Sequence, residues 1–312
     1  MICDTKFTMG WPPRDEAPVW LTIGNFDGVH LGHQALIKEM IRLAKVDDAK
    51  SMLINFWPNP KVFFTKEKGF YLTTRAEKTS LLSKMGVNEI VTLEFDQKLA
   101  SMSPQAFLAE IIHHVNLKGI VVGQNFALGK GRQGTPEVLT ELCAQQGVKF
   151  NVFPHVMMKE NPVSSTRIRA ALTAGKVDEV AKLLGRPYRL CSKVIGGAHV
   201  GKSIGVPTAN LFLEPEKFLP RKGVYATIAH LRNTDYQAVT SVGVRPTFGD
   251  DFEVTVETLI LDFDDDIYGE DLQVEFIRWL RPEEKFASVQ ELVDQIEEDK
   301  TVTRRIFENG FE

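Results

Sequence analysis

The amino-acid sequence predicts two domains of different class: an α/β domain built on a parallel sheet, and a small antiparallel β-barrel that ends in a helix. In the first half, short apolar runs alternate with helix-like segments, which is typical of βαβ units and a parallel sheet. In the second half, strand-like runs follow one another with turn residues between them, as in antiparallel barrels and sandwiches. Gly185-Arg186-Pro187 breaks the pattern between the halves, so we expect domains at 1–186 and 187–312.

The first domain should alternate strands and helices along its length. We expect strands at 19–26, 51–57, 89–95, 119–126 and 149–156, and helices at 32–46, 75–86, 104–115, 135–147, 164–174 and 176–184. Thr74 and Glu77 have the spacing of a capping box. A hydroxyl residue precedes proline at Ser103-Pro104 and Thr135-Pro136, which is a helix start signal. Because ligands of parallel sheets bind beyond the carboxyl ends of the strands, the segments that follow the strands are candidate binding sites.

The second domain should contain a run of short strands followed by one long helix. We expect the strands at 188–195, 223–231, 237–243, 252–263 and 272–279, and the helix at about 288–308. In that helix Val289, Leu292, Val293 and Ile296 recur at i, i+3, i+4 and i+7, which is the spacing of one apolar face. We expect this stripe to pack against the domain core rather than to bind a partner protein.

Composition limits the classes of function. The 312 residues are 43% hydrophobic with a net charge of −4, which permits ordinary cores and argues against a nucleic-acid binder, since such proteins show a basic bias. Neither a membrane span nor a signal peptide is predicted. The three cysteines are far apart and odd in number, so we expect reduced thiols without a disulfide or zinc role. We therefore expect a cytoplasmic protein with small-molecule substrates, a monomer or weak homo-oligomer, without nucleic-acid or membrane partners.

Residues 196–203 read GGAHVGKS and match the phosphate-loop pattern G-x-x-x-x-G-K-[ST] letter for letter. A phosphate loop needs a strand before it and a helix after it. Here Gly205 and Pro207 follow almost at once, and proline disfavours a helix at this place. We therefore reject a P-loop ATPase, although the glycines can still shape a loop whose N–H groups approach a phosphate.

The continuation, Pro207-Thr208-Ala209-Asn210, offers a different kind of site. A hydroxyl and an amide oxygen two residues apart face the same way on an extended segment. Both are hard oxygen ligands, suited to Mg²⁺ that carries nucleotide phosphates. Thr208 and Asn210 are therefore candidate magnesium ligands, and a polar turn without a ligand is the alternative.

A second candidate site follows the first buried strand, in residues 23–33, IGNFDGVHLGH. His30 and His33 are three residues apart at an expected helix start, so they share one face. There they can donate to phosphate oxygens where the helix dipole favours negative charge. Gly24 and Gly28 would let the backbone come close to a ligand. The alternatives are a capping role for His30 or a metal pair, for which no acidic or cysteine partner lies nearby.

Two further segments of the first domain fit a nucleotide site. Ser165 and Thr166 place hydroxyls at a helix start, and Arg169, about a turn further on, can hold a phosphate bidentately. The loop 123–134 is glycine-rich and basic; its Asn125 and Phe126 could contact a ring system, and a solvated linker is the alternative. The residues offer no activated nucleophile, so the chemistry would be positioning and charge stabilisation on ATP.

Taken as a set, the motifs resemble a known family, the bacterial bifunctional riboflavin kinase/FMN adenylyltransferases, also called FAD synthetases. In the first domain GNFDGVHLGH, VGQNFALG and VSSTRIRAAL resemble the adenylyltransferase motifs. In the second domain GKSIGVPTANL, KGVYAT, SVGVRPTFG, VETLILDFDDDIYG and LRPEEKF resemble the kinase motifs. The motifs occur in the family's order and span nearly the whole chain.

The resemblance implies a fold and two reactions. The family fold is an α/β Rossmann-like nucleotidyltransferase domain followed by a small six-stranded antiparallel β-barrel with a C-terminal helix. The second domain would transfer the γ-phosphoryl group of ATP to riboflavin, giving FMN, with Mg²⁺ as cofactor. The first domain would let the FMN phosphate attack the α-phosphorus of ATP, giving FAD and pyrophosphate.

The resemblance also assigns residues to the sites. The ATP-binding residues would be Gly24, Phe26, Asp27, Gly28, His30, His33, Ser165, Thr166 and Arg169 in the first domain, and Gly201, Lys202 and Thr208 in the second. His30 and His33 would also be catalytic. The flavin-binding residues would be Asn59, Asn125 and Phe126, and the Mg²⁺ ligands would be Thr208 and Asn210.

Glu257 would be the general base for the ribityl hydroxyl, according to the same resemblance. On an extended strand it shares a face with Leu259, Leu261 and Phe263, so it would stand at the rim of an apolar surface. A solvated carboxylate at a strand end is the alternative, and the residues alone do not favour Glu257 over Glu253 or Glu275. We expect the acidic turn 264–266 to be a solvated turn rather than a metal site.

The sequence departs from the family pattern at three places. Residues 58–60 are Pro-Asn-Pro where the family usually has Pro-His-Pro, so Asn59 cannot carry a positive charge. Ala127-Leu128 replaces a usual Arg-Phe and removes a cation and an aromatic face. Lys202 replaces an arginine and loses its bidentate fork. The first two changes raise one alternative, a riboflavin kinase with an impaired adenylyltransferase half; a flavin-binding regulator without catalysis is another.

Overall fold

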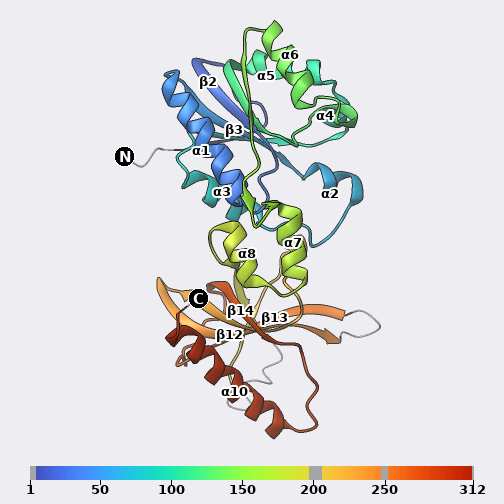
Figure 1. The fold of residues 1–312 in the computed structure, drawn as a ribbon. Helices are drawn as coiled ribbons and strands as arrows, with labels where there is room; N and C mark the ends of the chain where they lie inside the picture. Colours follow the sequence, from blue (N-terminus) through green and yellow to red (C-terminus); the bar gives the residue numbers. More distant parts are fainter. Residues whose placement is uncertain (1–4, 197–205, 247–251, 311–312) are drawn as a thin grey trace. The chain divides into compact units, whose positions relative to one another are not determined.

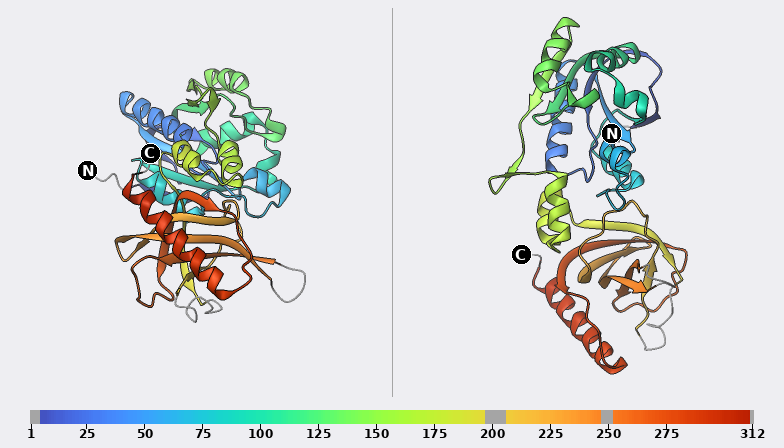
Figure 2. Two further views of the ribbon diagram at one scale, coloured as in Figure 1. Left: turned by 60° about the horizontal axis from the view of Figure 1, so that its bottom comes forward. Right: turned by 90° about the vertical axis from the view of Figure 1, so that its right-hand side faces the viewer.

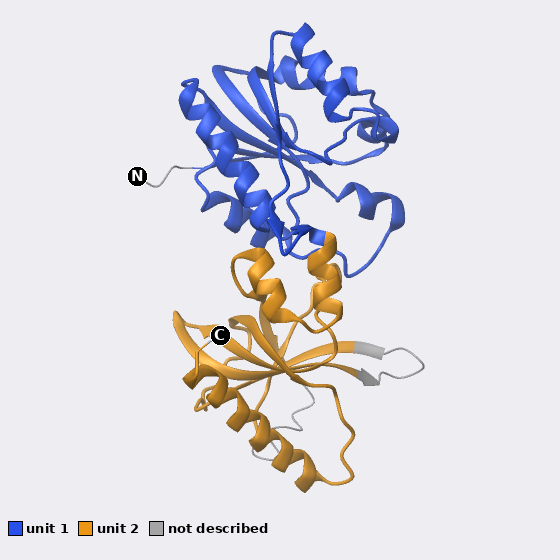
Figure 3. Cartoon of the chain, viewed as in Figure 1, with its two compact units in different colours: residues 1–165 blue, residues 166–312 orange. Residues whose placement is uncertain are grey.

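The computed structural model describes residues 5–196, 206–246 and 252–310 (Figure 1). The chain divides into two compact units, Met1–Ser165 and Thr166–Glu312 (Figure 3), and each is described here by itself. The boundary predicted at residues 185–187 lies inside the second of these units. Within the described residues, no helix combines the length and the apolar character that crossing a membrane requires.

The first unit is built on a six-stranded parallel sheet. Its strands are β1 Lys6–Met9, β2 Asp15–Ile23, β3 Lys50–Trp57, β4 Glu89–Glu94, β5 Val115–Gly123 and β6 Lys149–Phe153. Their order is β1-β4-β3-β2-β5-β6, and all neighbours are parallel. The chain moves outward from β2 on one side and then returns to its other side as β5. The adjoining ends of β2 and β5 are thus the topological switch point, where such sheets bind their ligands.

Helices cover both faces of this sheet (Figure 1). They are α1 Leu31–Val46, α2 Pro60–Thr65, α3 Arg75–Ser83, α4 Gln97–Ser101, α5 Pro104–His114 and α6 Pro136–Gln145, with the 3₁₀ turn η1 Lys130–Arg132. Alternate residues of β2 serve the two faces, because Leu21 packs with α5 and α6 while Trp20 packs with α1 and α3. A small hairpin, β7 Met157–Met158 with β8 Asn161–Pro162, precedes α7 Ser165–Thr173.

The helix start signals have different outcomes. The Thr74–Glu77 capping box is present, and Ser103 caps α5 by accepting from the N–H of Ala106 at 3.1 Å. Thr135 makes no capping hydrogen bond, because its hydroxyl donates to the carboxylate of Glu137 at 2.6 Å. Thr135 is therefore the N-cap residue before Pro136, as predicted, but its side chain does not cap the helix.

The second unit is a closed six-stranded barrel with flanking helices. The strands are β9 Tyr188–Ile195, β10 Ala209–Leu211, β11 Gly223–Leu231, β12 Thr234–Pro246, β13 Phe252–Ile260 and β14 Asp271–Arg281, paired antiparallel in the order β10-β13-β12-β11-β14-β9. α8 Val177–Leu184 packs on β9 and β14, and α10 Val289–Glu308 lies along the barrel (Figure 2). The predicted barrel with a terminal helix is confirmed.

The apolar stripe of α10 differs from the prediction. Val289 is 61% exposed, and Leu292 and Ile296 are half-buried because they line a cavity beside the barrel. The expected tight core contact is thus replaced in part by the wall of a cavity.

Gly119 of β5 gives a stability prediction for the first unit. A Cβ at this position would lie 2.7 Å from two ring atoms of Trp20, which is 1% exposed and held by a hydrogen bond from Nε1 to Asp47 at 2.8 Å. We expect Gly119→Ala to destabilise the protein by about 1–3 kcal/mol through overpacking. Gly123→Ala is the matched control, because a Cβ there meets nothing within 4 Å. Thermal unfolding should separate the two variants, and equal midpoints would contradict the prediction.

Candidate functional site

The segment after β2 forms a tight loop, residues 24–30, that leads into α1. Phe26, Gly28 and Val29 have left-handed backbones, with φ of 48°, 81° and 41°. The Phe26 ring is buried under Gly24, where a Cβ would lie 3.1 Å from the ring. Gly24 therefore gives this ring the room it needs, and Phe26 anchors the loop to the core.

Asp27 ties the same loop to residues 72 and 73 by hydrogen bonds. Its buried carboxylate accepts hydrogen bonds from the backbone N–H groups of Leu72 at 3.0 Å and Thr73 at 3.3 Å. The N–H of Gly28 donates to the Thr73 hydroxyl at 3.1 Å. Phe26 and Asp27 thus hold the shape of the loop, and their direct contact with ATP stays a prediction.

His30 and His33 lie together at the start of α1. Their rings stack with centroids 3.6 Å apart and planes 16° from parallel. His30 is buried and caps the helix, because its Nδ1 accepts from the backbone N–H of His33 at 3.2 Å. The capping role of His30, which sequence reasoning gave as an alternative to phosphate binding, is therefore present.

The charge state of His33 follows from its surroundings. Burial first, then the neighbouring His30 and Lys78, hold the pKa of His33 well below its ordinary value of 6.5. Its Nδ1 is buried and has no hydrogen-bond partner within the described part of the chain. A neutral imidazole with an unsatisfied buried nitrogen is suited to a hydrogen bond with a ligand.

Lys78 of α3 lies beneath the loop, and sequence reasoning did not find it. The side chain is 6% exposed, and its Nζ donates to the carbonyl oxygen of Asn25 at 3.3 Å and to Oδ1 of Asn55 at 2.9 Å. Burial lowers the pKa of Lys78 from 10.5 to about 8, although the charge of Asp27 acts in the opposite direction. Asn25 itself has a buried Oδ1 without a partner among the described residues. Both side chains therefore belong to the candidate site.

The lowered pKa of Lys78 gives a pH-dependent stability. Between pH 8 and 10.5 the unfolded chain keeps a proton that the folded chain has released, so stability rises with pH in this window. A shift of about 2.5 units at about 1.36 kcal/mol per unit amounts to roughly 3 kcal/mol. We expect Lys78→Met to lack this rise. Thermal unfolding of both proteins at pH 7.5 and 9.5 measures it, and parallel changes in the two midpoints would refute the expectation.

A cavity of about 490 Å³ opens at the carboxyl ends of β2, β3 and β5. Asn25 follows β2, Phe56 belongs to β3, and Asn125 and Phe126 follow β5. Its wall is rich in aromatic side chains, namely Phe56, Phe64, Phe95, Phe107 and Phe126. The volume and the apolar wall suit a flat aromatic ligand held by a few polar groups.

Four predicted residues of the first domain lie elsewhere or in other roles. Asn59 caps α2, with its Oδ1 accepting from the N–H of Lys61 at 2.9 Å, and it is not part of the cavity wall. The Ser165 hydroxyl donates to the carbonyl oxygen of Asp27 at 2.8 Å and so joins the start of α7 to the loop. Thr166 and Arg169 follow on α7, within the second unit.

The second candidate site lies on the barrel. Glu257 of β13 is directly opposite Asn210 of β10 in the strand register. The Thr208 hydroxyl donates to Oε2 of Glu257 at 3.3 Å. The sheet pairing thus brings together three predicted residues that are far apart in the sequence. Gly201 and Lys202 lie outside the described residues.

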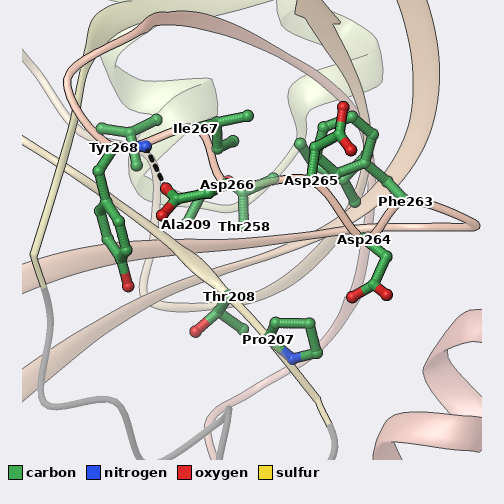
Figure 4. Close-up of a pocket in the computed structure, with 12 residues that line it drawn as sticks. Pro207, Thr208, Ala209, Thr258, Phe263, Asp264, Asp265, Asp266, Ile267 and Tyr268 are labelled. Atoms are coloured by element: carbon green, nitrogen blue, oxygen red, sulfur yellow. Dashed lines mark hydrogen bonds between the residues drawn. The ribbon is translucent and has the colours of Figure 1, made fainter.

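Thr208 stands between two cavities of the barrel. The larger, about 320 Å³, is lined by Glu257, Phe286 and Ile296. The smaller, about 170 Å³, is formed by residues 263–268 opposite Pro207 and Thr208 (Figure 4). Glu257 thus faces the larger cavity, and Thr208 borders both.

The acidic turn 264–266 is exposed, as expected for a solvated turn, but it also lines the smaller cavity. Asp265 pairs with Arg232 at 3.0 Å, and Asp266 accepts from the N–H of Tyr268 at 3.0 Å (Figure 4). Among the described residues, no group of three or more His, Cys, Asp or Glu side chains could hold a metal ion. The turn therefore forms part of the wall of the smaller cavity.

An ion pair joins α10 to the barrel beside the larger cavity. The guanidinium of Arg281 donates to the carboxylate of Asp299 at 2.8 Å from Nη2 and 3.0 Å from Nε. Both residues line the cavity, and the carboxylate is almost fully buried. This bidentate contact fixes the helix that forms one wall of the cavity.

Comparisons with known proteins match both parts of the chain. Residues 13–167 match a family model described as FAD synthetase, and residues 184–307 match one described as riboflavin kinase. The chain is 33% identical over 291 residues to the bifunctional riboflavin kinase/FMN adenylyltransferase of Listeria monocytogenes, covering 92% of each chain. It is 34% identical over 286 residues to the protein of the same name from Pseudomonas fluorescens, covering 91% of this chain and 92% of that one. The chain belongs to the bifunctional riboflavin kinase/FMN adenylyltransferase family.

A solved structure supports the fold of this riboflavin kinase/FMN adenylyltransferase family member. The crystal structure of a protein from Streptococcus pneumoniae, described as a macrolide-efflux protein, has a TM-score of 0.88 and 33% sequence identity. It covers 96% of this chain and 99% of that chain. The fold and the family inferred from the sequence motifs are therefore both confirmed, and both domains of the family are present.

Proposed function

We infer that this chain converts riboflavin to FMN in its barrel domain and FMN to FAD in its α/β domain, each time with ATP. Family membership supports the pair of reactions. The observation that carries the assignment to residues is the contact between Thr208 and Glu257 at the junction of two cavities. We assign riboflavin to the larger cavity and the ATP nucleotide to the smaller one, with the phosphoryl transfer between them.

In the kinase reaction Glu257 is the general base. It accepts the proton of the ribityl hydroxyl while the hydroxyl oxygen forms a bond to the γ-phosphorus of ATP. The bond from that phosphorus to the β,γ-bridging oxygen breaks, and ADP leaves. The apolar wall of the larger cavity, with Leu259 and Ile296, orients the flavin ring. Positioning of the two substrates is the main contribution of such a site.

Magnesium fits the donor set beside Glu257. The Thr208 hydroxyl and the Asn210 amide are oxygen donors on neighbouring positions of the barrel, and Mg²⁺ prefers a few protein oxygens together with substrate phosphates. We assign Thr208 and Asn210 as the residues that hold Mg²⁺-ATP. Bound there, the ion would neutralise charge on the phosphates.

In the adenylyltransferase reaction the imidazoles of His30 and His33 hold the ATP phosphates at the start of α1. A phosphate oxygen of FMN forms a bond to the α-phosphorus while the bond from that phosphorus to the α,β-bridging oxygen breaks, and pyrophosphate leaves. Ser165, Thr166 and Arg169 of α7 add hydroxyl groups and a positive charge for the phosphates. The flavin ring lies in the aromatic cavity with Asn125 and Phe126. Asn59 acts through α2, because it caps this helix, and Phe64 of α2 lines the cavity.

We propose that the adenylyltransferase domain is residues 1–186, which include α7 and α8, and that the riboflavin kinase domain is residues 187–312. We also propose that the protein acts in the cytoplasm. The FAD synthetase match ends at residue 167 and the riboflavin kinase match begins at residue 184, close to the proposed boundary.

The test of the proposed function incubates the purified protein with riboflavin, ATP and Mg²⁺ and separates the flavins by chromatography over time. FMN followed by FAD is the expected result. FMN alone would mean that Asn59 and Ala127-Leu128 have removed the second reaction and would favour the single-activity enzyme. If neither FMN nor FAD forms, the result would favour the flavin-binding regulator.

A further inference from the structure

The wall of the aromatic cavity in the first unit has one charged side chain among the described residues, that of Arg132. The rest of the wall is aromatic, aliphatic, glycine or asparagine. A phosphate ester is a dianion and needs a cation or several N–H donors in an apolar site. Arg132 is therefore the candidate cation of this cavity for such a phosphate.

Backbone contacts hold the loop that carries Arg132. Leu128 and Gly134 exchange two hydrogen bonds, at 3.1 and 2.9 Å, and so close the loop. The N–H of Lys130 donates to the carbonyl oxygen of Met102 at 2.7 Å, which ties the loop to the end of α4. Arg132 is thus presented from a loop of defined shape.

The side chain of Arg132 is oriented by Asn125. Its Nη2 donates to the backbone oxygen of Asn125 at 3.1 Å, and Asn125 also lines the cavity. This contact uses one of the five N–H groups of the guanidinium. The guanidinium is therefore held at the cavity wall with a fork suited to phosphate.

The backbone of Arg132 has a φ of 59°, a left-handed conformation that glycine adopts more easily than any other residue. Glycines flank this position closely, at 129 and 131. The chain nevertheless places an arginine there. Strained residues of this kind cluster at binding sites, where the side chain has a role that offsets the strain.

We propose that Arg132 binds the 5′-phosphate of FMN in the adenylyltransferase site and so makes this cavity selective for FMN over riboflavin. The proposal rests on the proposed function, since it concerns the flavin substrate of that site. Arg132 touches the substrate phosphate rather than the flavin ring, which the aromatic wall holds.

The experiment measures FAD formation from FMN and ATP by the full chain carrying Arg132→Gly or Arg132→Gln. Arg132→Gly removes the guanidinium without opposing the left-handed backbone, and Arg132→Gln keeps a donor for the Asn125 oxygen without the charge. We expect both variants to raise the KM for FMN by about tenfold to a hundredfold, the effect of losing a charge-assisted hydrogen bond. The KM for FMN should also become less dependent on salt.

Three controls belong to the same experiment. Lys130→Ala changes a cation of the same loop that does not line the cavity, and its KM for FMN should equal that of the wild type. Arg132→Lys keeps the charge and should recover part of the affinity. FMN formation from riboflavin in the same variant chains should be unchanged, which excludes a general folding defect.

Several outcomes would overturn the proposal while leaving the proposed function intact. An unchanged KM for FMN in Arg132→Gly would exclude phosphate binding. Wild-type behaviour of Arg132→Gln would mean that the arginine only positions Asn125. A raised KM for ATP with an unchanged KM for FMN would assign Arg132 to the nucleotide. If the wild type forms no FAD from added FMN, the proposed function fails first, and the inference fails with it.

Discussion

Glu257→Gln should lower the rate of FMN formation from riboflavin by about a hundredfold to ten-thousandfold, the usual contribution of a general base. Glutamine has nearly the same shape and keeps an oxygen that can accept the hydrogen bond from the Thr208 hydroxyl, 3.3 Å from Oε2 in the wild type. It cannot take the proton of the ribityl hydroxyl. Riboflavin binding should therefore persist while turnover is lost, and FAD formation from added FMN should be unchanged.

The matched control is Glu275→Gln, which changes a largely buried carboxylate of β14. Glu275 pairs with Arg189 at 3.2 Å and lines neither cavity, so its rate of FMN formation should stay close to that of the wild type. The measurement is initial rates of FMN formation together with riboflavin binding followed by flavin fluorescence. Equal rates in Glu257→Gln and the wild type would remove Glu257 from the reaction. Loss of binding in parallel with rate would assign it to substrate positioning instead.

The regular parts of the fold could be predicted because their signals are local. β3 is a buried apolar run, and α1 has an amphipathic pattern. Each was expected within one residue of its observed bounds. β1 was missed because Phe7 and Met9 are exposed and the strand forms by pairing with the distant β4. α2 and α4 were missed because six and five residues are too short to show a helical period.

The candidate sites divide in the same way. His30 and His33 are adjacent on one helix face, so their spacing in the sequence was enough to predict that they lie together. Lys78 contacts Asn25 and Asn55 across 53 and 23 residues of sequence, and no motif marks it. Glu257 needed the family resemblance, because the pairing of β10 with β13 that brings it to Asn210 is a non-local contact.

His33→Ala should lower kcat for FAD formation from FMN by about a hundredfold to a thousandfold, the usual effect of removing one hydrogen-bond donor from a site of developing charge. The imidazole is stacked on His30 and half-buried at the start of α1, so a side chain without a donor leaves the phosphates with one contact fewer. His33→Gln keeps a neutral donor and should retain more activity than the alanine variant. FMN formation from riboflavin should be unaffected.

The pH dependence separates a neutral His33 from a charged one. Because burial, then the neighbouring His30 and Lys78, hold its pKa well below 6.5, His33 stays neutral from pH 6.5 upward. The rate of FAD formation should therefore show no loss through this residue between pH 6.5 and 8, and the ratio of wild-type to His33→Gln rates should be constant over that range. A ratio that falls as the pH rises through 6.5 to 8 would mean that the charged imidazolium is the active form. His113→Ala, an exposed histidine of α5, is the control and should match the wild type throughout.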